Sequence, residues 1–229
     1  MFEKVSVVSR LAVSGVKRNL TKKGFKIVAR DPDFVVCYGG DGTVLFSERR
    51  FPEIPKLVIK KSAVCRKCDY SLHDLKNVLP MIKVGKFKIR KEMKLEATFN
   101  NERLVGLNEI QVRAKLPVYA LRFSVSVDTR AIGDLIGDGV VFATPFGSAG
   151  YYKSTGGKQF RKGIGVSFNN LHKRRVGSII VSEDSVIRVK ATRGPALVFA
   201  DNNERPLEFQ DNEAVIVRKS ESTANFICV

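Results

Sequence analysis

Short apolar runs alternate with helix-like stretches along the first 90 residues. Apolar runs at 5–8, 25–28, 34–38 and 56–59 predict strands, and the run at 34–38 has no charged position, as expected of a strand buried on both faces of a parallel sheet. Helices are predicted over 11–23, where Gly24 suits the C-terminal cap, over 44–50, and over 71–84, which Pro80 interrupts. Strands that alternate with helices predict an α/β domain over residues 1–90, with a Rossmann-like, mostly parallel sheet.

From about residue 87 the pattern changes to short strands separated by turns. Strands are predicted at 95–99 and 104–112, on either side of the turn-forming sequence Asn100-Asn101-Glu102-Arg103, and at 118–127, where apolar and polar positions alternate. Further strands at 140–143, 178–182, 186–191, 196–200 and 214–218 continue the pattern. We therefore predict a second, all-β domain over 91–229 with a sandwich-like architecture, whose last strand can return to the first domain.

Composition narrows the class of protein. Hydrophobic residues make up 44% of the 229, which is enough for a core, and no apolar run approaches the ~20 residues that span a bilayer. The beginning of the chain lacks the apolar stretch of a signal peptide, so we expect a cytoplasmic protein with no membrane partner. The formal charge of +17 attracts polyanions, or it reflects only a basic, well-solvated surface. Aromatic residues do not interleave with the basic ones, so nucleic acid is not the expected partner.

Cys65 and Cys68 form a single CxxC motif, and Asp69 and His73 follow closely. Together these residues can in principle bind a metal ion, or the two thiols can form a redox pair. Because no second CxxC accompanies the first, we expect a plain loop here and assign no metal ligands.

The segment Gly39-Gly40-Asp41-Gly42-Thr43 follows the buried strand and leads into a predicted helix. Glycines tolerate positive φ and let the backbone approach a ligand closely, and the start of a helix offers unpaired N–H groups to phosphate. A carboxylate in such a turn is explained by a role as a general base or as a magnesium contact beside a phosphoryl group in transfer. The alternative is a purely structural role, in which the segment is a tight turn and the Asp41 side chain caps the helix. The segment matches neither the Walker loop nor G-x-G-x-x-G, and the buried strand before it favours a phosphate-handling role.

Four segments together carry a resemblance to a known family. Gly39–Thr43 resembles the signature shared by NAD kinases, diacylglycerol and sphingosine kinases and 6-phosphofructokinases. The stretch from Asp138 to Gly157 is similar to the NAD kinase pattern of Asp-Gly, an apolar run, Thr-Pro-Thr-Gly-Ser-Thr-Ala-Tyr and a later Gly-Gly. Asn108-Glu109 and Asp201-Asn202-Asn203 resemble the family's Asn-Glu/Asp pair and its Asp-Gly-Gln turn. All four occur in the family's order, so the chain resembles a divergent, archaeal-type NAD kinase, which implies a phosphofructokinase-like α/β domain followed by the β domain.

The resemblance implies transfer of a phosphoryl group from ATP or polyphosphate to the adenosine ribose 2′-hydroxyl of NAD, giving NADP, with a divalent cation such as Mg²⁺. Asp41 is then the general base, and the remainder of Gly39–Thr43 lines the donor phosphates. Asn108 holds the adenine, Glu109 the ribose side and Asp138 the nicotinamide end. The full set of implied nucleotide-binding residues is Gly39, Gly40, Gly42, Thr43, Asn108, Glu109, Asp138, Thr144, Ala149, Gly150, Tyr151, Ser154 and Asn203. Each of these residues could instead have a purely structural role in a turn, a helix cap or the core, and only their joint order along the chain favours a role in nucleotide binding. Since the family is often dimeric or tetrameric, a homo-oligomer is expected.

Departures from the family's pattern leave the donor and acceptor open. Where the family has a glycine loop after the fourth strand, residues 60–67 read Lys-Lys-Ser-Ala-Val-Cys-Arg-Lys, and such a segment binds phosphate through cationic side chains rather than bare backbone. Phe46 stands where the family often has Lys or Arg, and Arg49 or Arg50, one helical turn on, can substitute. Phe146 and Ala149 replace threonines, and the second change removes a hydroxyl that would meet the nucleotide.

Two other functions stay open at this point. A related kinase with a lipid or nucleoside acceptor shares the glycine turn and the two-domain plan, but such kinases lack the long stretch from Thr144 to Gly157. A non-catalytic module that binds dinucleotide or nucleic acid would use the positive charge, but it gains little from the Asp41 carboxylate beside phosphates.

Overall fold

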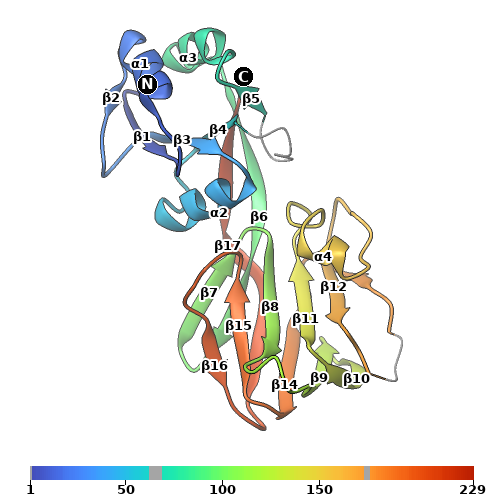
Figure 1. The fold of residues 1–229 in the computed structure, drawn as a ribbon. Helices are drawn as coiled ribbons and strands as arrows, with labels where there is room; N and C mark the ends of the chain where they lie inside the picture. The colour runs from blue at the N-terminus through green and yellow to red at the C-terminus, as the bar shows by residue number, and fades with distance from the viewer. Residues whose placement is uncertain (1, 62–68, 173–175) are drawn as a thin grey trace. The chain divides into compact units, whose positions relative to one another are not determined.

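The computed structural model describes residues 2–61, 69–172 and 176–229. The chain forms two compact units, Met1–Glu92 with Thr223–Val229, and Met93–Ser222, and each is described here by itself (Figure 1). The predicted metal or redox motif at Cys65 and Cys68 lies outside the described residues.

The first unit is an α/β domain built on a parallel sheet. Its elements are β1 (Lys4–Val8), α1 (Ser14–Lys22), β2 (Lys26–Ile27), β3 (Phe34–Gly39), α2 (Asp41–Arg50), β4 (Lys56–Lys60), β5 (Tyr70–Ser71) and α3 (Leu75–Lys83). The sheet has the order β17-β4-β3-β1-β2, with β5 beside β4. The chain leaves this unit along β6 (Lys88–Phe99) and returns to it along β17 (Ala214–Cys228).

Helices lie on both faces of this sheet, which explains why its central strand is apolar throughout. Val16 and Leu20 of α1 and Leu75, Leu79 and Ile82 of α3 belong to one core cluster with alternate residues of β3. Figure 1 shows α1 and α3 side by side. The α2 helix packs on β3, and every residue of that strand is buried. Pro80 does not interrupt α3, because buried Leu79 and Ile82 hold the helix against the sheet.

The second unit consists of two antiparallel sheets around a shared core. Its further strands are β7 (Glu102–Gly106), β8 (Glu109–Ala114), β9 (Leu121–Val127), β10 (Arg130–Gly137), β11 (Gly139–Ala143), β12 (Ile164–Asn169), β13 (Ile179–Val181), β14 (Ile187–Arg193), β15 (Ala196–Ala200) and β16 (Leu207–Phe209), and a short helix, α4 (Tyr151–Ser154), follows β11. One sheet runs β10-β9-β14-β17 and continues through β6 to β7, and the other runs β13-β12-β11-β8-β15-β16. The core between them holds Val112, Phe123, Phe142, Val189 and Phe209, among others. The predicted fold class, α/β followed by a sandwich-like β domain, is confirmed.

Two predicted features of the second unit have different outcomes. The hairpin turn between β6 and β7 is confirmed, because Phe99 pairs with Glu102 and the two intervening asparagines have φ of 46° and 67°, as a tight two-residue loop requires. The single strand predicted over 104–112 is wrong, because β7 ends at Gly106 and β8 begins only at Glu109. Of the helices in the described part of the chain, none is long and apolar enough to cross a membrane.

Candidate functional site

The glycine turn at the carboxyl end of β3 leads directly into α2. Gly40 has an extended backbone and serves as the N-cap, and its carbonyl accepts the N–H of Thr43 at 2.9 Å. A Cβ built on Gly39 would lie 2.3 Å from Thr43 Oγ1, so the threonine hydroxyl occupies the space that a side chain would need. A Cβ on Gly40 would meet nothing within 4 Å. No positive φ occurs in Gly39–Thr43, so close packing at Gly39 and open space at Gly40, rather than unusual dihedral angles, explain these two glycines.

Asp41 occupies the first helical position of α2, half-buried, and it is not the N-cap. The N-cap position of α2 is thus taken by Gly40, and Asp41 follows it in the first turn of the helix. A carboxylate in the first turn is stabilised by the positive end of the helix dipole. The same helix start offers backbone N–H groups to an anion, so carboxylate and anion-binding groups lie within one turn of chain.

A buried polar cluster under α2 fixes this helix to the sheet. Lys56 Nζ, from the first residue of β4, pairs with Glu48 Oε2 and also donates to the Phe51 carbonyl at 2.7 Å. Both side chains are buried, with 0% and 5% exposed. Nearby, burial raises the pKa of the Cys37 thiol to about 12, despite a hydrogen bond with Ser47. This pair therefore anchors the carboxyl-terminal half of α2 to β4.

Three turns of the second unit meet at Asp201. The two carboxylate oxygens of Asp201 accept the backbone N–H groups of Leu107 and Asn108 at 2.7 Å and that of Glu109 at 3.1 Å. Asp201 itself has a left-handed φ of 50°, and its own N–H donates to the Glu109 carbonyl. These bonds divert the backbone between β7 and β8, which is the physical reason that the predicted strand over 104–112 is broken.

Thr144, at the end of β11, ties a third turn to the same place. Its hydroxyl donates to the Leu107 carbonyl at 2.6 Å and accepts the N–H of Gly147 at 2.9 Å. A Cβ on Gly147 would lie 2.0 Å from the Asn108 carbonyl oxygen, so only glycine fits here. We call the set Asn108, Glu109, Thr144, Gly147 and Asp201 the three-turn cluster.

The side chains of Asn108 and Glu109 converge beside Gly150. A Cβ built on Gly150 would lie 3.6 Å from Glu109 Oε2 and 3.8 Å from Asn108 Nδ2. Asn108 Oδ1 is a buried acceptor with no hydrogen-bond partner among the described residues. Glu109 is buried, with 5% exposed. A buried amide oxygen of this kind favours a ligand that donates a hydrogen bond to it.

Of the other predicted residues, Asp138 lies away from this convergence, whereas Tyr151 directly follows Gly150 and Ser154 ends the same short helix. Asp138 precedes β11 and Thr144 follows it, so the five residues of that strand separate the two by about 20 Å. There Asp138 accepts a hydrogen bond from Asn170 Nδ2 at 2.7 Å. Tyr151 is 44% exposed with the Arg113 guanidinium 5.5 Å from its ring centroid, and Ser154 Oγ donates to the Tyr151 carbonyl. Asp138 therefore lies at the opposite end of β11 from Thr144 and the three-turn cluster.

Asn203 and Ala149 have turn positions. Asn203 Oδ1 accepts the Arg205 N–H at 3.2 Å, and its own N–H donates to Ala200. Ala149 is half-buried between Ser148 and Gly150. Asp201 is the residue to which the sequence assigned no role of its own, although the Asp201-Asn202-Asn203 motif marks it.

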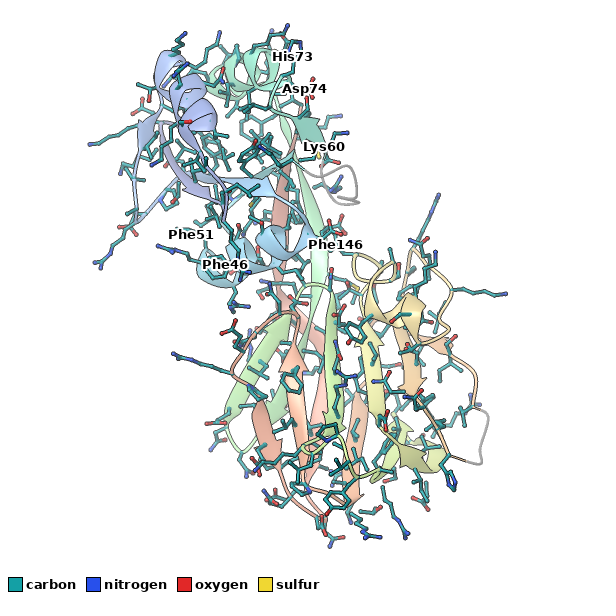
Figure 2. The ribbon with its side chains drawn as sticks, in the orientation of Figure 1. Phe46, Phe51, Lys60, His73, Asp74 and Phe146 are labelled. Carbon is teal, nitrogen blue, oxygen red and sulfur yellow. The ribbon has the colours of Figure 1, made fainter. Side chains whose placement is uncertain are left out.

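Cations flank the glycine turn within the first unit. Lys60 lies in register with Gly39 on the neighbouring strand, and the Lys61 N–H donates to the Gly39 carbonyl at 3.3 Å. Figure 2 shows Lys60 at the end of β4 and Phe46 on α2. The Arg49 guanidinium lies 5.4 Å from the centroid of the Phe46 ring. The cation of Arg49 therefore lies against Phe46, the residue that stands where the family often has Lys or Arg.

The described residues contain no cluster of three or more His, Cys, Asp or Glu that could hold a metal ion by itself. Asp41 alone fits the way in which Mg²⁺ is bound with nucleotides, by one or two carboxylates and by the phosphates of the substrate. When bound, such a cation offsets phosphate charge.

The family model of the ATP-NAD kinase C-terminal domain matches residues 107–229, a range that begins at the three-turn cluster. An NAD kinase of Methanothermobacter thermautotrophicus is 30% identical over 215 residues, which are 91% of this chain and 76% of that protein. The chain belongs to the NAD kinase family.

Solved structures agree with this family at the level of the fold. The crystal structure of an NAD kinase from Archaeoglobus fulgidus in complex with ATP superposes with a TM-score of 0.85, at 23% identity, over 97% of this chain and 92% of that one. The structure of yeast NADH kinase complexed with NADH gives a TM-score of 0.87, at 16% identity, over 100% and 84%. Both units of the NAD kinase fold are thus present in this chain.

Proposed function

We propose that this protein phosphorylates the adenosine ribose 2′-hydroxyl of NAD to give NADP, with ATP or polyphosphate as the phosphate donor. Membership of the NAD kinase family supports the reaction. The main structural support for this site is the glycine turn. There the backbone of Gly40 is open to a ligand, and the Asp41 carboxylate follows it in the first turn of α2.

In this proposal Asp41 takes the proton from the attacking hydroxyl. General-base catalysis requires a carboxylate within hydrogen-bond reach of that proton, on a rigid element. The buried Glu48–Lys56 pair under the same helix supports this role, because it restrains α2. The first-turn N–H groups of α2, with Gly39, Gly40, Gly42 and Thr43, hold the donor phosphates. A divalent cation, Mg²⁺ in the first place, reduces charge repulsion there.

The three-turn cluster holds the adenosine end of NAD. The unpartnered Asn108 Oδ1 suits an exocyclic amine of adenine, and the Glu109 carboxylate suits ribose hydroxyl groups. Contacts from Ala149, Gly150, Tyr151, Ser154 and Asn203, and a contact of Asp138 with the nicotinamide end, stay predictions. The long Thr144–Gly157 stretch and the family match leave no observation in favour of a lipid acceptor or of a non-catalytic binding role.

A homo-oligomer of two or four chains and a cytoplasmic location are further parts of the proposal. The edge strand β13 supports association of copies, because Ile179 and Ile180 are 36% and 51% exposed on it. Unpaired apolar edges are normally covered in native proteins.

A coupled assay for NADP tests the reaction and the base together. The wild-type chain is expected to make NADP from NAD with ATP or polyphosphate and Mg²⁺, and Asp41→Asn is expected to lower the rate by roughly 10²–10⁴-fold. Asp31→Asn serves as the matched control, since Asp31 is exposed in the same unit with φ of 50°, which asparagine also adopts. A wild-type chain that makes no NADP with either donor would overturn the function, and an Asp41→Asn rate equal to that of Asp31→Asn would overturn the base.

A further inference from the structure

A hollow of about 360 Å³ opens in the second unit, away from the three-turn cluster. Its walls come from the loop between β8 and β9, from the start of β9, from Ile136 of β10 and from the Arg193-Gly194-Pro195 connection between β14 and β15. The volume lies within the range of small-molecule sites.

The hollow and the three-turn cluster lie at opposite ends of one strand. Glu109 begins β8 and belongs to the cluster, whereas Ala114 ends β8 and lines the hollow. Six residues of antiparallel strand span roughly 17 Å between the first and last Cα. A molecule in the hollow is therefore not the part of NAD that Asn108 and Glu109 hold.

Two arginines face each other across the rim of the hollow. Arg122 of β9 and Arg193 of β14 are direct partners in the antiparallel ladder, and both are exposed. Neither forms an ion pair with a carboxylate among the described residues. Like charges directly opposite each other on a sheet are destabilising, and an anion between them removes that cost.

An irregularity in the strand produces this pairing. Ala191 pairs with Phe123, and a regular ladder would then place Thr192 opposite Arg122. The register shift between Ala191 and Arg193 instead places Arg193 there. Bulges of this kind re-aim side chains and are over-represented beside binding sites. The chain thus replaces a neutral neighbour of Arg122 by a second guanidinium.

Nearby acidic side chains are occupied by other partners. Glu208 pairs with Lys115 at 2.8 Å, and Asp211 Oδ1 accepts the Gly194 N–H at 2.5 Å. The remaining lining is apolar or aromatic, with Leu116 51% exposed, Tyr119 67% exposed and Leu121 as the buried floor. An arginine fork suits phosphate, and exposed apolar and aromatic side chains suit the face of a ring.

We propose that this hollow binds an organic phosphate of mononucleotide size, with its phosphate between Arg122 and Arg193 and its ring against Tyr119 and the apolar wall. Such a site is separate from the adenosine site of the three-turn cluster and gives the enzyme a second contact with a phosphorylated metabolite.

Titration with AMP, followed by ¹H–¹⁵N NMR, tests the proposal at the hollow itself. Saturable shifts of the Tyr119, Arg122 and Gly194 amides are expected for the wild-type chain. Arg122→Gln/Arg193→Gln is expected to weaken the affinity read from Tyr119 and Gly194 by about tenfold or more, since two charge-assisted bonds are lost. Arg188→Gln is the matched control, because Arg188 is exposed on the same strand but does not line the hollow. All variants replace exposed side chains, and unchanged melting temperatures confirm that they fold.

The outcomes separate the hollow from any other AMP site, because only amides of the hollow are scored. Amides of the hollow that do not move in the wild-type chain, or that move equally in the double variant, overturn the site. A parallel titration with inorganic phosphate tests the ring. Phosphate is expected to bind more weakly than AMP, and equal affinity overturns the assignment of a ring-bearing ligand.

Discussion

The buried Lys56–Glu48 pair under α2 gives the sharpest prediction about stability. Lys56→Met removes the ammonium group and leaves the Glu48 carboxylate buried beside the Phe51 carbonyl. Removal of one partner of a buried pair costs about 3–5 kcal/mol, because the remaining charge stays buried without its counter-ion. For a chain of this size each kcal/mol lowers the melting temperature by about 2–4 °C, so a drop on the order of 6–20 °C is expected.

The double variant Lys56→Met/Glu48→Leu separates loss of the charge pair from loss of packing. Replacement of both charges by apolar groups of similar volume is often neutral or stabilising, so the double variant is expected to recover most of the loss. Urea unfolding of the four proteins gives the coupling free energy directly. The double variant also tests positioning: if the pair orients Asp41, kcat falls although stability is restored.

The chain contains its own control for this prediction. Lys115 and Glu208 in the second unit form a pair at 2.8 Å with 43% and 36% of their side chains exposed. Lys115→Met removes the same type of group from a solvated pair and is expected to leave the melting temperature almost unchanged. The reasoning is refuted if Lys56→Met is no more destabilising than Lys115→Met.

Three further predictions follow from single groups. Asp201→Ala should destabilise the second unit by about 3 kcal/mol or more and raise the KM for NAD, because three backbone N–H groups lose a charged acceptor; urea unfolding and steady-state kinetics measure the two effects. Burial raises the pKa of Cys37 to about 12 in the fold, against 9.0 as its ordinary value, so between pH 9 and 12 the unfolded chain binds fewer protons than the folded one. The free energy of unfolding should therefore fall as the pH rises from about 9 towards 12. Cys37→Ala should flatten this pH dependence, as measured by unfolding curves at several pH values. Lys60→Ala should raise the KM for polyphosphate severalfold and leave the KM for NAD unchanged, whereas exposed Lys76→Ala of α3 should change neither.

The sequence predicts the first unit well because its signals are local. The run at 34–38 is apolar because α2 lies on one face and α1 and α3 on the other, and each of these helices has its own buried residues. The start of α3 is the exception. Asp74 Oδ2 accepts both the N–H and the hydroxyl of Ser71 at 2.7 Å, so residues 71–74 form a turn and the helix begins only at Leu75. Side-chain bonds of this kind compete with helix formation without disturbing the apolar pattern.

The second unit was harder to predict, because several strands there depend on distant partners. β10 (Arg130–Gly137) carries glycines and a register shift at Gly133, which hide the alternation of a strand. β12 (Ile164–Asn169) is buried at every position because β11 and β13 flank it and the core and Tyr152 cover it, although its sequence contains a glycine, a serine and an asparagine. Gly165 is required there, since a Cβ would lie 2.7 Å from the Tyr152 ring. Gly165 thus weakens the prediction of a strand from sequence, but in the fold it gives the buried Tyr152 ring the space to pack against β12.

The three-turn cluster shows why the order of the motifs along the chain indicated a site, although the sequence could not predict how its residues contact one another. Leu107, Thr144 and Asp201 are far apart in sequence, and each alone is a turn residue with a common local explanation. In the fold, the Asp201 carboxylate and the Thr144 hydroxyl both bond to the same backbone segment, so that their bonds are satisfied only together. That mutual dependence holds Asn108 with its side-chain oxygen buried and without a described partner. A buried acceptor that stays unpaired costs about 1–3 kcal/mol, so a hydrogen-bond donor on a bound nucleotide would be favoured at the Asn108 side-chain oxygen.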